Sequence, residues 1–238
     1  MELEKVTDGR ARWYDDACGT ALALEFVGER WSLLIMRELV YGARRFGEIR
    51  ANLPGISANV LTQRLESLEA AGILVRRRLP SPANVQVYDL TDWGRDAAPL
   101  IRDLGRWAAR SPRHDPMLFM SPASAMMSLD ALMDRSRAAG VRVTVAFRFP
   151  GDAFLVALDG GALTVRRGEG PADATFAGDT MAMRMTIYGK LPFDAEDGLS
   201  ISGDRAAAQR FVDLFALPEK VTAQAAPETN GDPRVRAG

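Results

Sequence analysis

A short turn between two helical patterns places the strongest constraint on how the first half of this chain can fold. The segment RRFGEIRANL has apolar residues at helical spacing, and the following LPGIS contains a proline and a glycine that cannot continue a helix. Ser57 is a typical N-cap for the next pattern, SANVLTQRLESLEAAG, in which Leu61, Leu65 and Leu68 share one face. The sequence therefore predicts two helices joined by a tight turn.

Flanking segments extend this pair of helices into a domain. ILVRRRL and VQVYDL have strand-like patterns and are joined by PSPAN, so we expect a β-hairpin, or wing, after the second helix. Upstream, ALALEFVG and RWSLLIMRELV predict two more helices, and downstream Thr91 is the expected cap of one long helix. We expect this domain to occupy residues 1–113.

Basic residues are concentrated in the same region. Residues 1–113 contain 17 basic and 15 acidic residues, the remainder contains 13 and 16, and positions 41 to 80 hold seven arginines and three glutamates. A local basic surface on a near-neutral protein indicates a polyanionic partner, although a solvated surface is the alternative for each arginine. Arg64 could instead form an ion pair with Glu48 or Glu66 and stabilise the fold.

The second helix of the pair offers side chains suited to base edges. Asn and Gln can bond adenine in a bidentate manner, so Asn59, Thr62 and Gln63 are the expected base readers. Arginines, hydroxyls and helix N-termini hold phosphates and set position. The expected phosphate or minor-groove contacts are Arg44, Arg45, Ser57, Arg76, Arg78 and Asn84.

Several short motifs in this region occur in a characteristic order. They are G-x-R-W at 28–31, R-F-x-E-I at 45–49, G-I-S at 55–57, L-x-x-R-L at 61–65 and Y-x-L-T at 88–91. With these motifs, a run of about 80 residues resembles the HxlR family of winged-helix transcriptional regulators, relatives of the MarR type. The resemblance implies a homodimer that uses its N- and C-terminal helices as the interface and inserts two recognition helices into double-stranded DNA.

Cys18 stands where redox-responsive members of that family often carry a cysteine, thirteen positions before Trp31. In those members a proline usually follows, whereas Gly19 follows here. The alternative is a small buried apolar residue near the dimer interface, because a free cysteine usually packs as a hydrophobe. A thiol sensor would need exposure and a lowered pKa.

The second half, expected at residues 118–217, combines helical and strand patterns. Residues 121–138 predict a helix, VRVTVAFRF and DAFLVALDGGALTVRR predict strands, and LSISGDRAAAQRFVDLF predicts a short strand and a last helix. TFAGDTMAMRMTIYGK predicts a strand and then a helix, although its methionines also alternate as in a strand. Residues 218–238 have few large apolar residues and predict a disordered tail.

The segments ADATFAGDTMAMRMTIYGK and LSISGDRAAAQRFVDLF resemble sterol-carrier-type domains, in which a curved sheet and helices surround an apolar cavity. The expected fold class is therefore α+β, an N-terminal winged helix-turn-helix plus a C-terminal sterol-carrier-like α/β domain. The resemblance implies an apolar small-molecule effector, with core packing as the alternative for each wall residue. The expected walls are Phe147, Phe149, Phe154, Val156, Met181, Met185, Phe211 and Phe215.

Other functions find less support in the sequence. One cysteine and one histidine, His114, leave no cluster with zinc spacing, and no phosphate-binding glycine loop is present, so we expect no metal, no cofactor and no enzyme. No secretory signal or bilayer-length apolar run appears, which indicates a cytoplasmic protein without a membrane partner. The alternatives are a carrier of lipid-like molecules with a vestigial DNA-binding domain, and a hydrolytic or redox enzyme.

Overall fold

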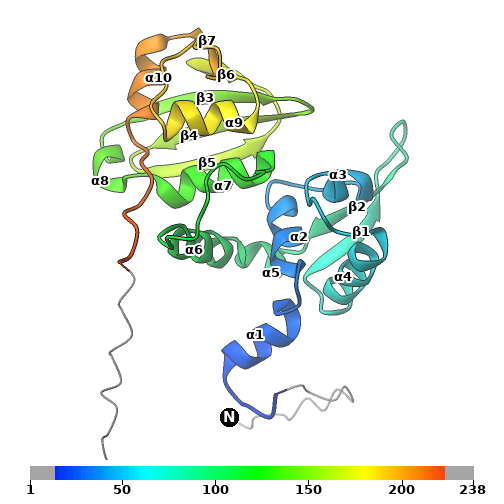
Figure 1. Cartoon of the computed structure of the whole chain (residues 1–238). Coiled ribbons are helices and arrows are strands. Elements are labelled where there is room, and N and C mark those ends of the chain that lie inside the picture. Colours follow the sequence, from blue (N-terminus) through cyan, green and yellow to red (C-terminus); the bar gives the residue numbers. More distant parts are fainter. Residues whose placement is uncertain (1–13, 223–238) are drawn as a thin grey trace, which may run out of the picture.

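The computed structural model describes residues 14–222, which form an N-terminal helical domain with a hairpin and a C-terminal α/β domain (Figure 1). The N-terminal residues 1–13, on which the absence of a secretory signal was argued, lie outside the described residues. Most of the expected tail, residues 223–238, lies outside them as well.

The first domain is built from the elements that the sequence predicts between residues 19 and 109. In chain order they are α1 (Gly19–Val27), α2 (Ser32–Leu39), α3 (Phe46–Ala51), α4 (Ala58–Ala70), β1 (Leu74–Arg78), β2 (Gln86–Leu90), α5 (Asp92–Asp96) and α6 (Ala98–Ala109). Its core is closed by Ile35 and Leu39 of α2 and by Leu61, Leu65 and Leu68 of α4, which are all buried. The predicted apolar face of α4 is thus confirmed.

Local signals fix where these helices begin. Ser57 Oγ accepts a hydrogen bond from Val60 N at 3.3 Å, and Gly55 supplies the left-handed turn before it with φ +89°. Thr91 caps α5, as expected, but the single long helix is divided at Ala97 into α5 and α6. Pro99 lies in the first turn of α6 and has no N–H to continue the hydrogen bonds of α5, which explains the division.

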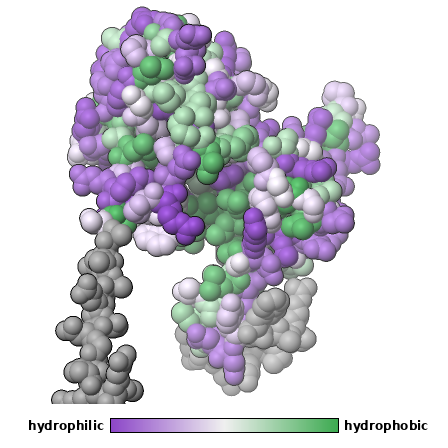
Figure 2. Space-filling model, in the orientation of Figure 1, coloured by the Kyte–Doolittle hydropathy of each residue, from purple (hydrophilic) through white to green (hydrophobic). Residues whose placement is uncertain are grey.

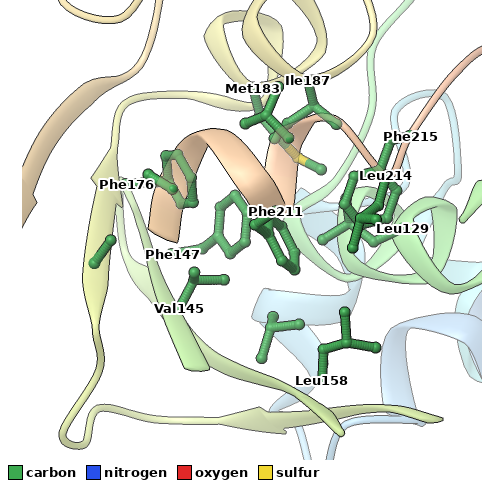
Figure 3. Packing of buried hydrophobic residues seen from close by; sticks show 14 of the residues in the cluster. Leu129, Val145, Phe147, Leu158, Phe176, Met183, Ile187, Phe211, Leu214 and Phe215 are labelled. Carbon is green, nitrogen blue, oxygen red and sulfur yellow. The ribbon is translucent and has the colours of Figure 1, made fainter. Parts of the chain in front are cut away.

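The second domain contains one mixed sheet with helices packed on it. Its elements are α7 (Pro122–Leu132), α8 (Arg135–Ala138), β3 (Arg142–Phe149), β4 (Asp152–Asp159), β5 (Ala162–Arg167), β6 (Ala174–Ala177), α9 (Thr180–Ile187), β7 (Ser200–Gly203) and α10 (Arg205–Val212). The five strands are ordered β5-β4-β3-β6-β7, and β3 and β6 are parallel while the other neighbours are antiparallel. Side chains of α7, α9 and α10 meet those of the sheet in one core (Figure 3).

One predicted helix of this domain is confirmed, and a second is divided in two. Residues 180–187 are helical, as predicted, because Asp179 Oδ1 accepts from Ala182 N at 2.7 Å and caps α9. The single helix expected over 121–138 is instead broken between α7 and α8. Asp134 N donates to Leu214 O at 2.8 Å and Met133 forms a bridge with Phe215, so contacts distant in sequence interrupt the helix.

The two domains are packed against each other. Met127 of α7 lies in the core of the first domain, and Ser121 Oγ donates to the buried Glu38 Oε1 at 2.7 Å. The rings of Tyr41 and Phe154 meet edge to face with centroids 5.7 Å apart. Residues 218–222 of the expected tail run beside the end of α6, where Val221 N donates to Arg110 O at 2.8 Å and Lys220 Nζ donates to Ala109 O at 2.9 Å. No helix among residues 14–222 is long and apolar enough to cross a bilayer.

Candidate nucleic-acid interface

The solvent-facing side of α4 is polar and unobstructed. Asn59, Thr62 and Gln63 are all exposed, and their spacing places them on one face of the helix. The opposite face carries the buried leucines, so the orientation of α4 is fixed by core packing. Figure 1 shows α4 and the β1–β2 hairpin on the side of the first domain away from the five-stranded sheet. The structure therefore brings the three expected base readers together on an accessible helix.

The start of the helix-turn-helix is held by local polar contacts. Arg45 N donates to Glu48 Oε2 at 2.8 Å, which satisfies a free amide at the N-terminus of α3. The Arg45 side chain is exposed beside this cap. Arg64 pairs with Glu29 at 3.2 Å, and not with Glu48 or Glu66 as the sequence suggested, because Glu48 is turned back to the start of its own helix.

Arg44 lies in a place that the sequence did not indicate. Its side chain is buried, and its guanidinium forms an ion pair with Asp152 at the start of β4 and a longer contact of 3.7 Å with Glu48. Arg167 of β5 pairs with the same Asp152 carboxylate and stacks over the ring of Phe154. Arg44 therefore joins the two domains, and its guanidinium is withdrawn from the surface on which a phosphate would lie.

The hairpin presents three consecutive arginines, of which two have carboxylate partners. Arg76 pairs with Glu69 at 2.9 Å, and Arg77 pairs with Asp89. Arg78 forms no ion pair among the described residues, and its Nε lies 3.4 Å from the carbonyl oxygen of Asn84 in the exposed hairpin loop. Arg78 is thus the hairpin arginine with the most freedom to contact a phosphate.

The eight expected cavity walls lie in or beside the core of the second domain. Phe147 stacks on Phe176 with centroids 5.0 Å apart, and Phe211 packs on Phe215 at 4.9 Å. Figure 3 shows these rings filling the space between the sheet and α10. Six of the eight are buried in this core, and the other two, on α9, are half-buried. None of them lines the large cavity that the structure contains.

That cavity has a volume of about 640 Å³ and lies between the two domains. It is bordered by α1, α2 and α6 of the first domain and by α7 and α9 of the second. Figure 2 shows apolar surface gathered in a hollow below the second domain and above α1. Sequence reasoning missed this site because its walls come from segments that are distant along the chain.

Cys18 is exposed at the N-cap of α1. Hydrogen bonds from the amide and hydroxyl of Thr20 and from the amide of Ala21 lower the pKa of its thiol. The expectation of a buried cysteine is therefore not met in the single chain, and the thiol is more acidic than an ordinary cysteine.

The sequence contains one histidine, His114, whose Nδ1 lies 3.3 Å from Lys220 Nζ. Burial and the positive charge of Lys220 both lower the pKa of this histidine.

The geometry defines a winged helix-turn-helix protein with an added α/β domain. Residues 26–115 match the model of the family described as HxlR-like helix-turn-helix. The uncharacterized HTH-type transcriptional regulator YvaP of Bacillus subtilis is 39% identical over 87 residues, which are 36% of this chain and 80% of that relative. The chain belongs to the HxlR-like helix-turn-helix family.

Two further comparisons also found transcriptional regulators. The uncharacterized HTH-type transcriptional regulator Rv3095 of Mycobacterium tuberculosis is 41% identical over 102 residues, which are 43% of this chain and 63% of that relative. The structure of the reduced form of the transcriptional regulator YodB from B. subtilis aligns with 42% of this chain and 100% of its own, with 31% identity and a TM-score of 0.38. The family match runs from residue 26 to residue 115, so it covers the first domain from the end of α1 onward and leaves the second domain without a family assignment.

Proposed function

We propose that this protein is a sequence-specific transcriptional regulator of the cytoplasm that binds double-stranded DNA as a homodimer and responds to a small molecule through its second domain. The observation that carries the proposal is the exposed polar face of α4 beside the arginine-bearing hairpin. The family membership supports it, because the relatives that match are named as HTH-type transcriptional regulators.

In this proposal α4 enters the major groove. Asn59, Thr62 and Gln63 contact base edges, which carry the sequence information. Ser57, at the N-terminus of α4, binds a phosphate with its hydroxyl hydrogen, since its oxygen already caps the helix. The remaining contacts are made to phosphates or in the minor groove by Arg45, Arg76, Arg78 and Asn84.

The dimer is proposed from apolar surface that one chain leaves exposed. No residue of α1 is buried, although the helix carries Leu22 and Leu24. Along α6, Leu100, Leu104 and Trp107 are 70%, 48% and 72% exposed and lie on one stripe. Apolar patches of this kind mark protein–protein interfaces. Two copies that pair these helices place their α4 helices in successive major grooves.

We propose that the second domain senses a ligand or supports assembly of the dimer, and that only the first domain contacts DNA. Residues 114–238 carry 13 basic and 16 acidic residues, and a net acidic surface is repelled by phosphate. Its five-stranded sheet with helices on it is compatible with the sterol-carrier-like domain suggested by the sequence. The cavity favours one other function, a carrier of lipid-like molecules, which predicts ligand uptake without sequence-specific DNA binding.

Substitutions in α4 and in the hairpin separate the two kinds of DNA contact. Gln63→Ala and Asn59→Ala are each expected to lose about 1–3 kcal/mol of discrimination at one base pair, because each removes a bidentate donor and acceptor. Arg78→Ala and Arg45→Ala are expected to weaken binding to all sequences and to lower the salt slope by about 1. Fluorescence anisotropy on matched and mismatched duplexes over a salt titration measures both effects.

Arg148→Ala is the matched control, since Arg148 is exposed on the second domain and, among residues 14–222, pairs only with Glu169. This variant is expected to bind DNA as the wild type does. Unchanged specificity in both Gln63→Ala and Asn59→Ala would show that α4 does not read bases. A loss in Arg148→Ala equal to that in Arg78→Ala would show that DNA contacts extend to the second domain.

A further inference from the structure

The cavity between the domains has the size and lining of a small-molecule site. Its volume of about 640 Å³ lies within the range of roughly 300–1,000 Å³ that is typical of such sites. The walls are mainly apolar side chains from five helices of the two domains (Figure 2). The main apolar contributors are Trp31, Leu34, Leu104, Met127, Ala131 and Tyr188.

Arg184 of α9 brings a buried charge to this apolar wall. Its side chain is only 7% exposed, and it forms no ion pair among residues 14–222. Its Nη1 donates to the carbonyl oxygens of Pro116 and Leu118 and its Nε donates to Thr180 O, but its Nη2 meets only the thioether sulfur of Met181, at 3.5 Å. Burial also lowers the pKa of this guanidinium, although the charges of Asp179 and Asp115 act in the opposite direction.

Most other polar groups on the cavity wall already have partners; Arg30, which stacks on Trp31, is exposed to solvent. Arg102 pairs with Asp103 and Asp130, and Arg37 pairs with Glu38. The Ser128 hydroxyl donates to Ala125 O, so the Tyr188 hydroxyl donates to Ser128 Oγ at 2.7 Å. Burial raises the pKa of Tyr188, which therefore remains a neutral phenol. Arg184 is thus a deep cation on this wall that forms no ion pair in the described chain, although Asp179 and Asp115 act on its charge from a longer distance.

We propose that the cavity between the domains binds an amphipathic carboxylate, with an apolar body against α2, α6 and α7 and its carboxylate on Arg184. A guanidinium forms its strongest hydrogen bonds with a carboxylate, and the mainly apolar walls suit the apolar body of such a ligand. A carboxylate there would give Nη2 an oxygen acceptor and the guanidinium an ion-pair partner. A second copy of the chain is a poorer occupant of the cavity, because it would bring leucines from α1 and α6 and would leave Arg184 without an ion-pair partner.

The position of the cavity gives such a ligand a way to act on the DNA-binding domain. Trp31, on its wall, has φ +84°, a strained conformation for a bulky residue, and stands directly before α2. Arg184 holds the linker between α6 and α7 through the carbonyls of Pro116 and Leu118. A ligand that contacts both can favour one arrangement of the two domains. This effect on DNA binding rests on the proposed function of the first domain, whereas the binding of the ligand in the cavity does not.

Calorimetric titration of the full-length protein with octanoate and with 1-octanol tests the inference without DNA. The two probes share an apolar chain and differ in charge at neutral pH. We expect one octanoate per chain and an affinity at least about 10-fold higher than that of octanol, the usual gain from a charged hydrogen bond. Failure of sequence-specific DNA binding would leave this result unchanged, so the two proposals can fail separately.

Two pairs of variants locate the site. An added Cβ at Gly105 or at Gly140 meets no atom within 4 Å, but only Gly105 lines the cavity, so Gly105→Leu is expected to abolish octanoate binding and Gly140→Leu to preserve it. Arg184→Gln is expected to reduce the ratio of the affinity for octanoate to the affinity for octanol to about 1. Arg106→Gln, on the exposed side of α6, is expected to leave this affinity ratio unchanged. The steric pair keeps the test valid if Arg184→Gln fails to fold.

Three results would overturn the inference. Equal affinity for octanoate and octanol in the wild type would remove the carboxylate from the proposal. No binding of either probe to the wild-type dimer would show that the cavity is closed or is filled by the second copy. Binding that persists in Gly105→Leu would place the ligand elsewhere in the molecule.

Discussion

Replacing Asp152 with alanine is expected to lower the free energy of unfolding by about 3–5 kcal/mol. The Asp152 side chain is 6% exposed and pairs with both Arg44 and Arg167, which are themselves largely buried. Alanine would leave the Arg167 guanidinium without a counter-ion and Arg44 with only its longer contact to the exposed Glu48, and an unpaired buried charge is more costly than the ion pair is favourable. Urea denaturation followed by circular dichroism measures the loss.

Asp159→Ala is the matched control for this substitution. Asp159 ends the same strand, β4, but pairs with Arg142 on the surface, where both side chains are mostly exposed. An exposed ion pair contributes little, so the control is expected to unfold as the wild type does. A similar loss in both variants would show that the Asp152 cluster does not hold the domains together. The backbone N–H and carbonyl of Arg44 form hydrogen bonds with Tyr88 of β2, so a shift of Arg44 would also displace the hairpin. For this reason Asp152→Ala is also expected to weaken DNA binding.

Replacing Trp107 with aspartate is expected to raise the dissociation constant of the proposed dimer by at least about 100-fold, the effect of removing an interface hot spot. The indole is 72% exposed in the single chain and lies on the α6 stripe that we propose as the dimer surface. A charge there would have to be desolvated when the second copy docks. Light scattering is expected to show a mass of twice 25.9 kDa for the wild type and 25.9 kDa for the variant. The affinity for DNA should also fall when the dimer dissociates, since a single α4 reads only one half-site.

Leu118→Asp controls for the cost of placing an acid on exposed apolar surface. Leu118 is 66% exposed but belongs to the linker between α6 and α7, outside the α1 and α6 surfaces. This variant is expected to stay dimeric. A wild-type protein of 25.9 kDa at working concentration would refute the dimer, and dissociation in Leu118→Asp alone would move the interface to the second domain.

Elements that depend on local chemistry could be predicted from the sequence. The cap at Ser57, the turn at Gly55 and the apolar face of α4 involve residues a few positions apart, so their pattern is visible in the chain. The same holds for α9, where the Asp179 cap decides between helix and strand although the methionines alternate. The exposed positions of Asn59 and Gln63 followed directly from the buried leucines, because helical periodicity fixes both faces at once.

Features that depend on contacts between distant segments could not be predicted. The partner of Arg44 is 108 positions away, and nothing near Arg44 distinguishes a buried arginine from one that contacts phosphate. The break between α7 and α8 depends on Leu214 in the same way. Phenylalanines suited to a cavity wall are equally suited to a core, and here Phe147 and Phe211 belong to the core while the cavity forms between the domains.

Selection of duplexes from a random DNA library with the full-length protein tests whether this protein reads DNA sequence as a dimer. We expect enrichment of a two-fold symmetric sequence whose half-sites are centred about 10 base pairs apart, or a multiple of that spacing, because two α4 helices of a dimer enter successive major grooves. We also expect Gln63→Ala, carried through the same selection, to relax the preference at one position in each half-site. A library that stays random with the wild-type protein would show that the protein does not bind DNA in a sequence-specific way.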